Sequence, residues 1–141
     1  MRRALRIYAA ALSAAAICAA AAAMAQSTLK TPTYTLEQAK RGEAEYAQSC
    51  ASCHGQHLDD GQFAAPLRGP AFAAHWGQGG LDAPFTVMTT MMPPANPGGL
   101  PGTTYADLLA FILSKNSVAA STAELPADLD ALATMAAPSG N

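Results

Sequence analysis

The feature that most constrains this chain is a pentapeptide containing two cysteines and a histidine, Cys50-Ala51-Ser52-Cys53-His54. On a helical turn, residues three and four positions apart share one face, so the two thiols and the imidazole point the same way. This spacing is typical of covalent haem attachment, in which two sulfurs add across the haem vinyl groups while the imidazole binds the iron. The pattern therefore predicts one covalent haem c, with Cys50 and Cys53 as thioethers and His54 as an axial ligand.

Three other chemistries use paired cysteines at this spacing: a structural disulfide, a zinc half-site and a thiol oxidoreductase. A zinc site needs further cysteines or clustered histidines, and His57 and His75 are badly spaced for it. A thiol oxidoreductase carries its cysteines after a buried strand, at the start of a helix. Here the cysteines come at the end of a helical pattern, so haem attachment is favoured over all three.

The first 25 residues have the composition of an export signal. Three arginines precede an apolar stretch at residues 7–23, and Ala23-Met24-Ala25 forms a small-residue cleavage site. Cleavage removes Cys18 and leaves two cysteines in an oxidising compartment. The sequence thus predicts a periplasmic protein without membrane insertion after cleavage, and an uncleaved membrane anchor is the alternative.

Removal of that signal makes the chain more acidic than its full-length net charge of −2, because residues 26–141 keep five Lys and Arg against ten Asp and Glu, a net charge of −5. Nucleic-acid binding requires clustered Lys and Arg, so no nucleic-acid partner is expected. The same charge predicts attraction to a basic protein partner, with a rate of electron transfer that falls as salt rises.

The rest of the sequence predicts an all-α domain with long loops, because helical periodicity occurs and strand-like alternation does not. Residues 26–34 indicate a short tether, residues 35–135 one domain, and residues 136–141 a frayed tail. The loop-rich stretch at 55–101 is long for so small a domain, which indicates that it wraps around something.

The first helix is expected to begin after Thr35 as N-cap, with Gln38 completing a capping box, and to run to Cys50. Gly42 interrupts it at about 1 kcal/mol relative to alanine, which indicates close approach of another helix. A further helix is predicted at 70–76, with proline in its first turn. Another is predicted to follow Asp82 as its N-cap and to end at Met91. A longer helix is predicted at 103–115, with Asn116 as its left-handed stop.

A haem iron has a sixth coordination position, and the sequence offers five candidates for it: Met88, Met91, Met92, His57 and His75. His57 lies too close to His54 in the chain to reach the opposite face of the porphyrin. His75 is more simply an exposed position on a short helix, and Met88 a filler of the core.

Met92 is the preferred sixth ligand. It directly precedes Pro93-Pro94, and two prolines stiffen an extended loop that can hold a thioether over the iron. Met91 remains the alternate, because a shift of one residue in this loop would exchange the two.

Six stretches of the chain match a known family: residues 35–38 with Gly42 and Tyr46, 50–55, 66–69 with Phe72 and Trp76, 90–100, 105–107 with 111–113, and 124–128. On these the chain resembles a class I cytochrome c, and is most similar to the small single-haem cytochromes that accompany quinoprotein (PQQ-dependent) alcohol dehydrogenases. The resemblance implies the class I cytochrome c fold, a few helices and long loops wrapped around one haem.

The resemblance also implies roles for single residues. Pro66 would offer its carbonyl to the second imidazole nitrogen of His54. Trp76 would lie near a haem propionate, with a plain core tryptophan as the alternative. Gly42 and Tyr46 would pack against Phe111 where the first and last main helices cross. Relatives tend to have glycine after Asn116, where this chain has serine.

A haem bound by histidine and methionine in an apolar pocket keeps its ligands in both oxidation states. The expected function is therefore that of an electron carrier, not an enzyme. It would be a monomer that moves one electron between a dehydrogenase, such as a quinoprotein alcohol dehydrogenase, and an acceptor such as a terminal oxidase. The alternatives are a haem subunit fixed in a dehydrogenase complex, and a haem enzyme or gas sensor with an open sixth position.

Overall fold

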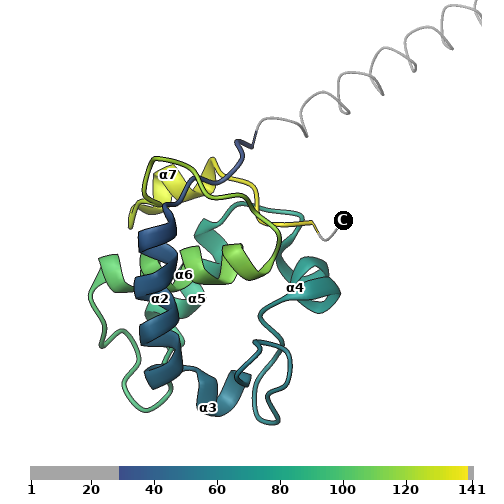
Figure 1. Ribbon diagram of the computed structural model, residues 1–141, viewed down its shortest axis with the longest axis vertical. Helices are drawn as coiled ribbons and strands as arrows, with labels where there is room; N and C mark the ends of the chain where they lie inside the picture. The colour runs from purple at the N-terminus through teal and green to yellow at the C-terminus, as the bar shows by residue number, and fades with distance from the viewer. Residues whose placement is uncertain (1–28, 140–141) are drawn as a thin grey trace, which may run out of the picture.

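The computed structural model describes residues 29–139, in which six helices are joined by long loops and no strand is formed (Figure 1). The helices are α2 (Leu36–Ser49), α3 (Ala51–His54), α4 (Gly69–Trp76), α5 (Asp82–Met91), α6 (Gly102–Lys115) and α7 (Leu129–Ala133). The predicted all-α class is confirmed. No helix of the described range is long and apolar enough to cross a membrane. The predicted export signal lies outside the described residues.

The most extensive helix contact joins α2 and α6, which cross in the body of the molecule (Figure 1). Gly42 lies at the crossing, and a Cβ added there would collide with the backbone carbonyl of Asp107. The rings of Tyr46 and Phe111 meet one turn further along, with centroids 5.2 Å apart. The predicted close approach at Gly42 and the predicted contact of Tyr46 with Phe111 are both confirmed.

The start of α2 is only half as expected. The Thr35 hydroxyl accepts a hydrogen bond from the Gln38 N–H at 3.1 Å, so Thr35 is the N-cap. The Gln38 side chain does not complete a capping box. It is buried, and it pairs with the backbone of Leu125, accepting from its N–H at 2.7 Å and donating to its carbonyl at 2.9 Å. The amide therefore ties α2 to the C-terminal arm.

The two ends of the described chain are bound to the domain, so the tether and the frayed tail were wrong for these residues. Tyr34 is 2% exposed, and its hydroxyl donates to the Val118 carbonyl at 2.6 Å. The backbone N–H of Lys30 donates to the Thr134 carbonyl at 2.7 Å, and the Lys30 carbonyl accepts from the Ala136 N–H at 2.8 Å. Ala137 is buried as well. These segments are polar in composition, which is why a tether and a frayed tail were predicted. Burial of the Tyr34 ring and pairing of the backbone groups nevertheless stabilise them against the domain.

The end of α6 is hydrogen-bonded to the loop region. Asn116 has φ −109°, and the left-handed residue is Ser117 at φ 62°, so the predicted stop was off by one position. The Asn116 side chain donates to the Leu67 carbonyl and accepts from the Gly69 N–H, both at 2.9 Å. This amide therefore holds the chain that leads into α4. The predicted N-cap of α5, Asp82, was also off by one position, because the N-cap is Leu81 and Asp82 is the first helical residue.

Candidate functional site

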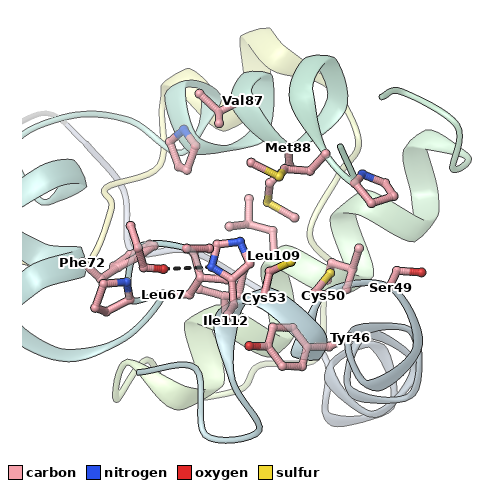
Figure 2. Close-up of a pocket in the computed structure, with 18 of the residues that line it drawn as sticks. Tyr46, Ser49, Cys50, Cys53, Leu67, Phe72, Val87, Met88, Leu109 and Ile112 are labelled. Atoms are coloured by element: carbon pink, nitrogen blue, oxygen red, sulfur yellow. Dashed lines mark hydrogen bonds between the residues drawn. The ribbon is translucent and has the colours of Figure 1, made fainter. Parts of the chain in front are cut away.

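A cavity of about 490 Å³ opens between α3, α4, α5, α6 and the loop at 63–67 (Figure 2). Its walls are mainly aliphatic and aromatic side chains, among them Phe72, Leu109 and Ile112. Within the described part of the chain, no Lys, Arg, Asp or Glu lines it. A hollow with apolar walls and a few polar groups is suited to a flat, hydrophobic cofactor.

The two cysteines and the histidine of the pentapeptide all line this cavity. Cys50 ends α2 and begins α3, with φ −126° and ψ −37°, and the N–H groups of Cys53 and His54 both donate to its carbonyl at 3.1 and 3.0 Å. This single turn brings the three side chains to one wall. Figure 2 shows the sulfur atoms of Cys50 and Cys53 on one side of the hollow and Met88 on another.

Both thiols are free, which argues against the disulfide alternative. Burial, with the nearby charges of Glu45 and Cys53, raises the pKa of Cys50 to about 11. Among residues 29–139 no group of three or more His, Cys, Asp or Glu could hold a metal ion, so the zinc alternative gains no support.

The His54 ring is anchored by its Nδ1, which lies 2.8 Å from the carbonyl oxygen of Ala65. The expected partner, the carbonyl of Pro66, was therefore wrong by one residue, while the Pro66 ring lines the cavity. The loop is closed by the Leu67 N–H donating to the Leu58 carbonyl at 2.7 Å, and this closure sets which carbonyl faces the imidazole. With Nδ1 engaged, Nε2 is the nitrogen left to bind a metal.

The structure separates the two adjacent methionines. Met92 lines the cavity, whereas Met91 is 58% exposed and lies outside the lining. Met92 has left the helix, with φ −120° and ψ 148°, as expected for a residue before proline. Its carbonyl accepts a hydrogen bond from the buried Tyr105 hydroxyl at 2.6 Å, which fixes the backbone at this point.

Met88 also lines the cavity, four residues before Met92 and therefore one helical turn away from it. The expectation that Met88 only fills the core is incomplete, because its side chain also faces the hollow (Figure 2). Two thioethers thus lie in the wall, with Met92 on the extended segment.

The remaining histidines differ in place. His57 is exposed, lies outside the lining, and its ring bonds to Asp60 at 2.9 Å, which lowers the pKa of that carboxyl. His75 is exposed as expected but does line the cavity, and its ring meets the edge of Trp76 with centroids 4.4 Å apart. Trp76 is half-buried in the same wall, so its predicted neighbourhood to a propionate stays a prediction.

Sequence reasoning missed three residues of the site. Tyr105 was included only in a stretch that resembles the family, although a tyrosine on a mainly apolar helix usually needs a partner for its hydroxyl. Ala65 carries no side-chain signal, because it acts through its backbone. Phe63 is 82% exposed at the cavity. An aromatic residue within a polar loop is the pattern that could have identified it.

An all-α fold around an apolar cavity that gathers Cys50, Cys53 and His54 on one wall is that of a c-type cytochrome, a class that carries haem c and transfers electrons. The model of the family "Cytochrome C oxidase, cbb3-type, subunit III" matches residues 37–112, and the chain belongs to this family. Neither the curated proteins nor the solved structures gave a match to this chain.

The residues present fit haem c. Two free thiols three residues apart, an imidazole anchored at Nδ1 and a thioether all lie in the walls of one apolar cavity. Cys50 and Cys53 would attach the group through their sulfurs, and His54 and Met92 would bind its iron. When bound, the group supplies an iron that accepts and releases one electron.

Proposed function

We propose that this protein is a periplasmic electron carrier with a single, covalently bound haem. The observation that carries the proposal is that Cys50, Cys53, His54 and Met92 all line one apolar cavity. Imidazole and thioether ligation leaves no open position for a substrate, so the same ligands serve both oxidation states. The chain's own contribution is to hold the ligands, exclude water from the iron and favour Fe(II).

The anchors of the ligands support this role. Ala65 holds the imidazole of His54, and Tyr105 holds the backbone of Met92, at 2.8 and 2.6 Å. Fixed ligands change little in position when one electron moves, which keeps the cost of reorganisation small. A gas sensor or haem enzyme would instead need one of these ligands to leave.

We propose a dehydrogenase as electron donor, with a quinoprotein alcohol dehydrogenase as the specific candidate, and a terminal oxidase as acceptor. The resemblance described above supports the donor, and the oxidase in the family description supports the acceptor. The same description names a subunit, which favours a second candidate function, a haem subunit fixed in a larger complex. The solution mass with and without detergent, measured on protein expressed with its full N-terminus, separates a free carrier from a fixed subunit.

The covalent haem is tested by intact-mass measurement of protein produced together with the haem-attachment machinery. We expect a mass increase of one haem, and loss of stable attachment in a Cys50→Ala, Cys53→Ala double variant. Ser52→Ala is the matched control, because Ser52 lies between the cysteines, is exposed and does not line the cavity. An unmodified wild-type mass would refute the proposal.

Carbon monoxide tests the closed sixth position. The reduced wild-type protein should not bind the gas at neutral pH, because the iron already has two protein ligands. Rapid and complete formation of a carbon monoxide adduct would instead favour the gas sensor or haem enzyme.

A further inference from the structure

The amide of Asn116, directly after the last residue of α6, does not line the cavity but joins two segments that do. It donates a hydrogen bond to the Leu67 carbonyl and accepts one from the Gly69 N–H, both at 2.9 Å. It also donates to the Ile112 carbonyl, one turn earlier in its own helix, at 2.9 Å. Donor and acceptor sides of the amide are both engaged, so its orientation is fixed.

Leu67 is held on both sides of its backbone. Its N–H donates at 2.7 Å to the carbonyl of Leu58, which is buried in the core, and its carbonyl accepts from Asn116. Ala65, whose carbonyl oxygen lies 2.8 Å from the Nδ1 of His54, is only two residues earlier in the chain. Because so short a segment has little freedom, a fixed Leu67 restricts where the Ala65 carbonyl can lie.

Other contacts of this loop do not hold it against the helices. Ala65 is exposed, so packing does not fix its carbonyl. The Arg68 guanidinium reaches back within the same loop, to Asp59 at 3.3 Å. Among the described residues, the hydrogen bonds that join 63–69 to α6 and its end are the two made by Asn116. This amide therefore ties the loop to a helix that is buried along most of its length.

The same amide also caps α4. That helix begins at Gly69, and its N-cap residue, Arg68, makes no side-chain hydrogen bond to it. The N–H groups of a first helical turn have no partner inside the helix, and Asn116 supplies one for Gly69. One side chain thus fixes both the loop that contacts His54 and the helix that follows it.

Resting on the haem binding proposed above, we propose that Asn116 is a positioning residue for the iron ligand His54. By fixing Leu67, it holds the Ala65 carbonyl against the imidazole Nδ1 and sets the strength of that hydrogen bond. A hydrogen bond at Nδ1 makes the imidazole a stronger electron donor through Nε2, which favours Fe(III). Asn116 therefore lowers the reduction potential from outside the cavity.

The test is Asn116→Asp in the holoprotein. The carboxylate keeps the shape of the amide and an acceptor for Gly69, but it has no N–H for Leu67 and places a negative charge against two carbonyls. Hydrogen exchange of the His54 Nδ1–H, followed by NMR of the Fe(II) state, measures the hydrogen bond to Ala65 directly. We expect this N–H to exchange about twofold to tenfold faster than in the wild type, and the equilibrium constant for reduction to rise by a similar factor.

Gln38→Glu is the matched control. Gln38 is also an amide that joins a distant backbone, that of Leu125, through one donated and one accepted hydrogen bond. It lies outside the cavity wall and connects α2 to the C-terminal arm. This variant should lower the unfolding free energy but keep the wild-type exchange of the His54 ring and the wild-type potential. The pair separates a positioning role from a general loosening of the fold.

Asn116→Ala, with Gln38→Ala as its control, removes the hydrogen bonds without adding a charge and replaces the first pair if the carboxylate prevents folding. The inference is overturned if the His54 ring N–H exchanges no faster in the Asn116 variant than in its Gln38 counterpart, or if the potential does not rise. Either result in a protein that carries haem leaves the proposed function intact, whereas failure of the wild type to bind haem would remove both.

Discussion

The α2–α6 crossing and the loop region at 55–101 are held together by different means. At the crossing, Gly42 lets two backbones touch, Tyr46 packs on Phe111, and Arg41 pairs with Asp107 at 2.8 Å. The loop region instead surrounds a cavity and leaves Phe63 82% exposed. The comparison indicates that one half is stabilised by the chain's own packing, while the other depends on what fills the cavity.

The largest expected effect comes from removing the cofactor through His54→Ala. The variant should accumulate no stable holoprotein and should lose the cooperative thermal transition of the wild type, because the centre of the core is missing. Hydrogen exchange should then show more protection at the α2–α6 crossing than in the loop region. His57→Ala, outside the cavity, is the control. A haem-free His54 variant that melts near the wild-type temperature would contradict this account.

At the α2–α6 crossing, Gly42→Ala is expected to lower the stability of the protein. The added methyl would collide with the Asp107 backbone, which cannot move as a side-chain end can, so we expect a loss of about 1–3 kcal/mol in unfolding free energy. Denaturant unfolding of the holoprotein measures it. Gly79→Ala is the control, because a Cβ there meets nothing within 4 Å. Equal stability of the two variants would show that the helices do not touch at Gly42.

A smaller effect distinguishes two tyrosines that make the same kind of bond in the two halves. Tyr105 donates to Met92 beside the cavity and Tyr34 donates to Val118 away from it, both at 2.6 Å. Each change to phenylalanine should cost about 0.5–1.5 kcal/mol. Only Tyr105→Phe should also allow the reduced protein to bind carbon monoxide slowly, because it frees the Met92 backbone. The same gas kinetics in both variants would remove the positioning role from Tyr105.

The smallest effect concerns the surface. Net charge after residue 25 is −5, yet among residues 29–139 no Lys, Arg, Asp or Glu lines the cavity wall. The electron-transfer rate with a basic partner should therefore fall with salt, but by less than about tenfold. Stopped-flow rates over a range of ionic strength measure this. A rate that rises with salt would exclude attraction by charge.

Features governed by neighbours in the chain could be predicted from the sequence. The Thr35 cap, the end of α5 at Met91 and the grouping of Cys50, Cys53 and His54 all depend on residues within one or two turns. The existence of α6 followed from helical periodicity, and the close approach at Gly42 from the cost of glycine in a helix. Local rules were sufficient for the cap, the helix end and the cysteine–histidine turn because the partners lie a few residues away, and Gly42 was informative because glycine is costly within a helix.

Features set by distant partners could not be predicted. The Gln38 side chain forms no capping box and is hydrogen-bonded instead to the backbone of Leu125, 87 residues away. Ala65 rather than Pro66 faces His54, because the closure of the loop at Leu58 and Leu67 decides the register. Tyr34 and Ala137 are buried by segments that meet only in the folded chain. Patterns of residue type carry no record of these pairings.

The central claim, that the cavity wall supplies both axial ligands, is tested most directly by the near-infrared Fe(III)–thioether charge-transfer band. We expect Met92→Ala to abolish the band, to open the reduced iron to carbon monoxide and to lower the potential, since a thioether favours Fe(II). Met91→Ala, at an exposed side chain outside the cavity, should leave all three unchanged. Loss of the band in the Met91 variant with its retention in the Met92 variant would contradict the account, and retention in both would point to Met88.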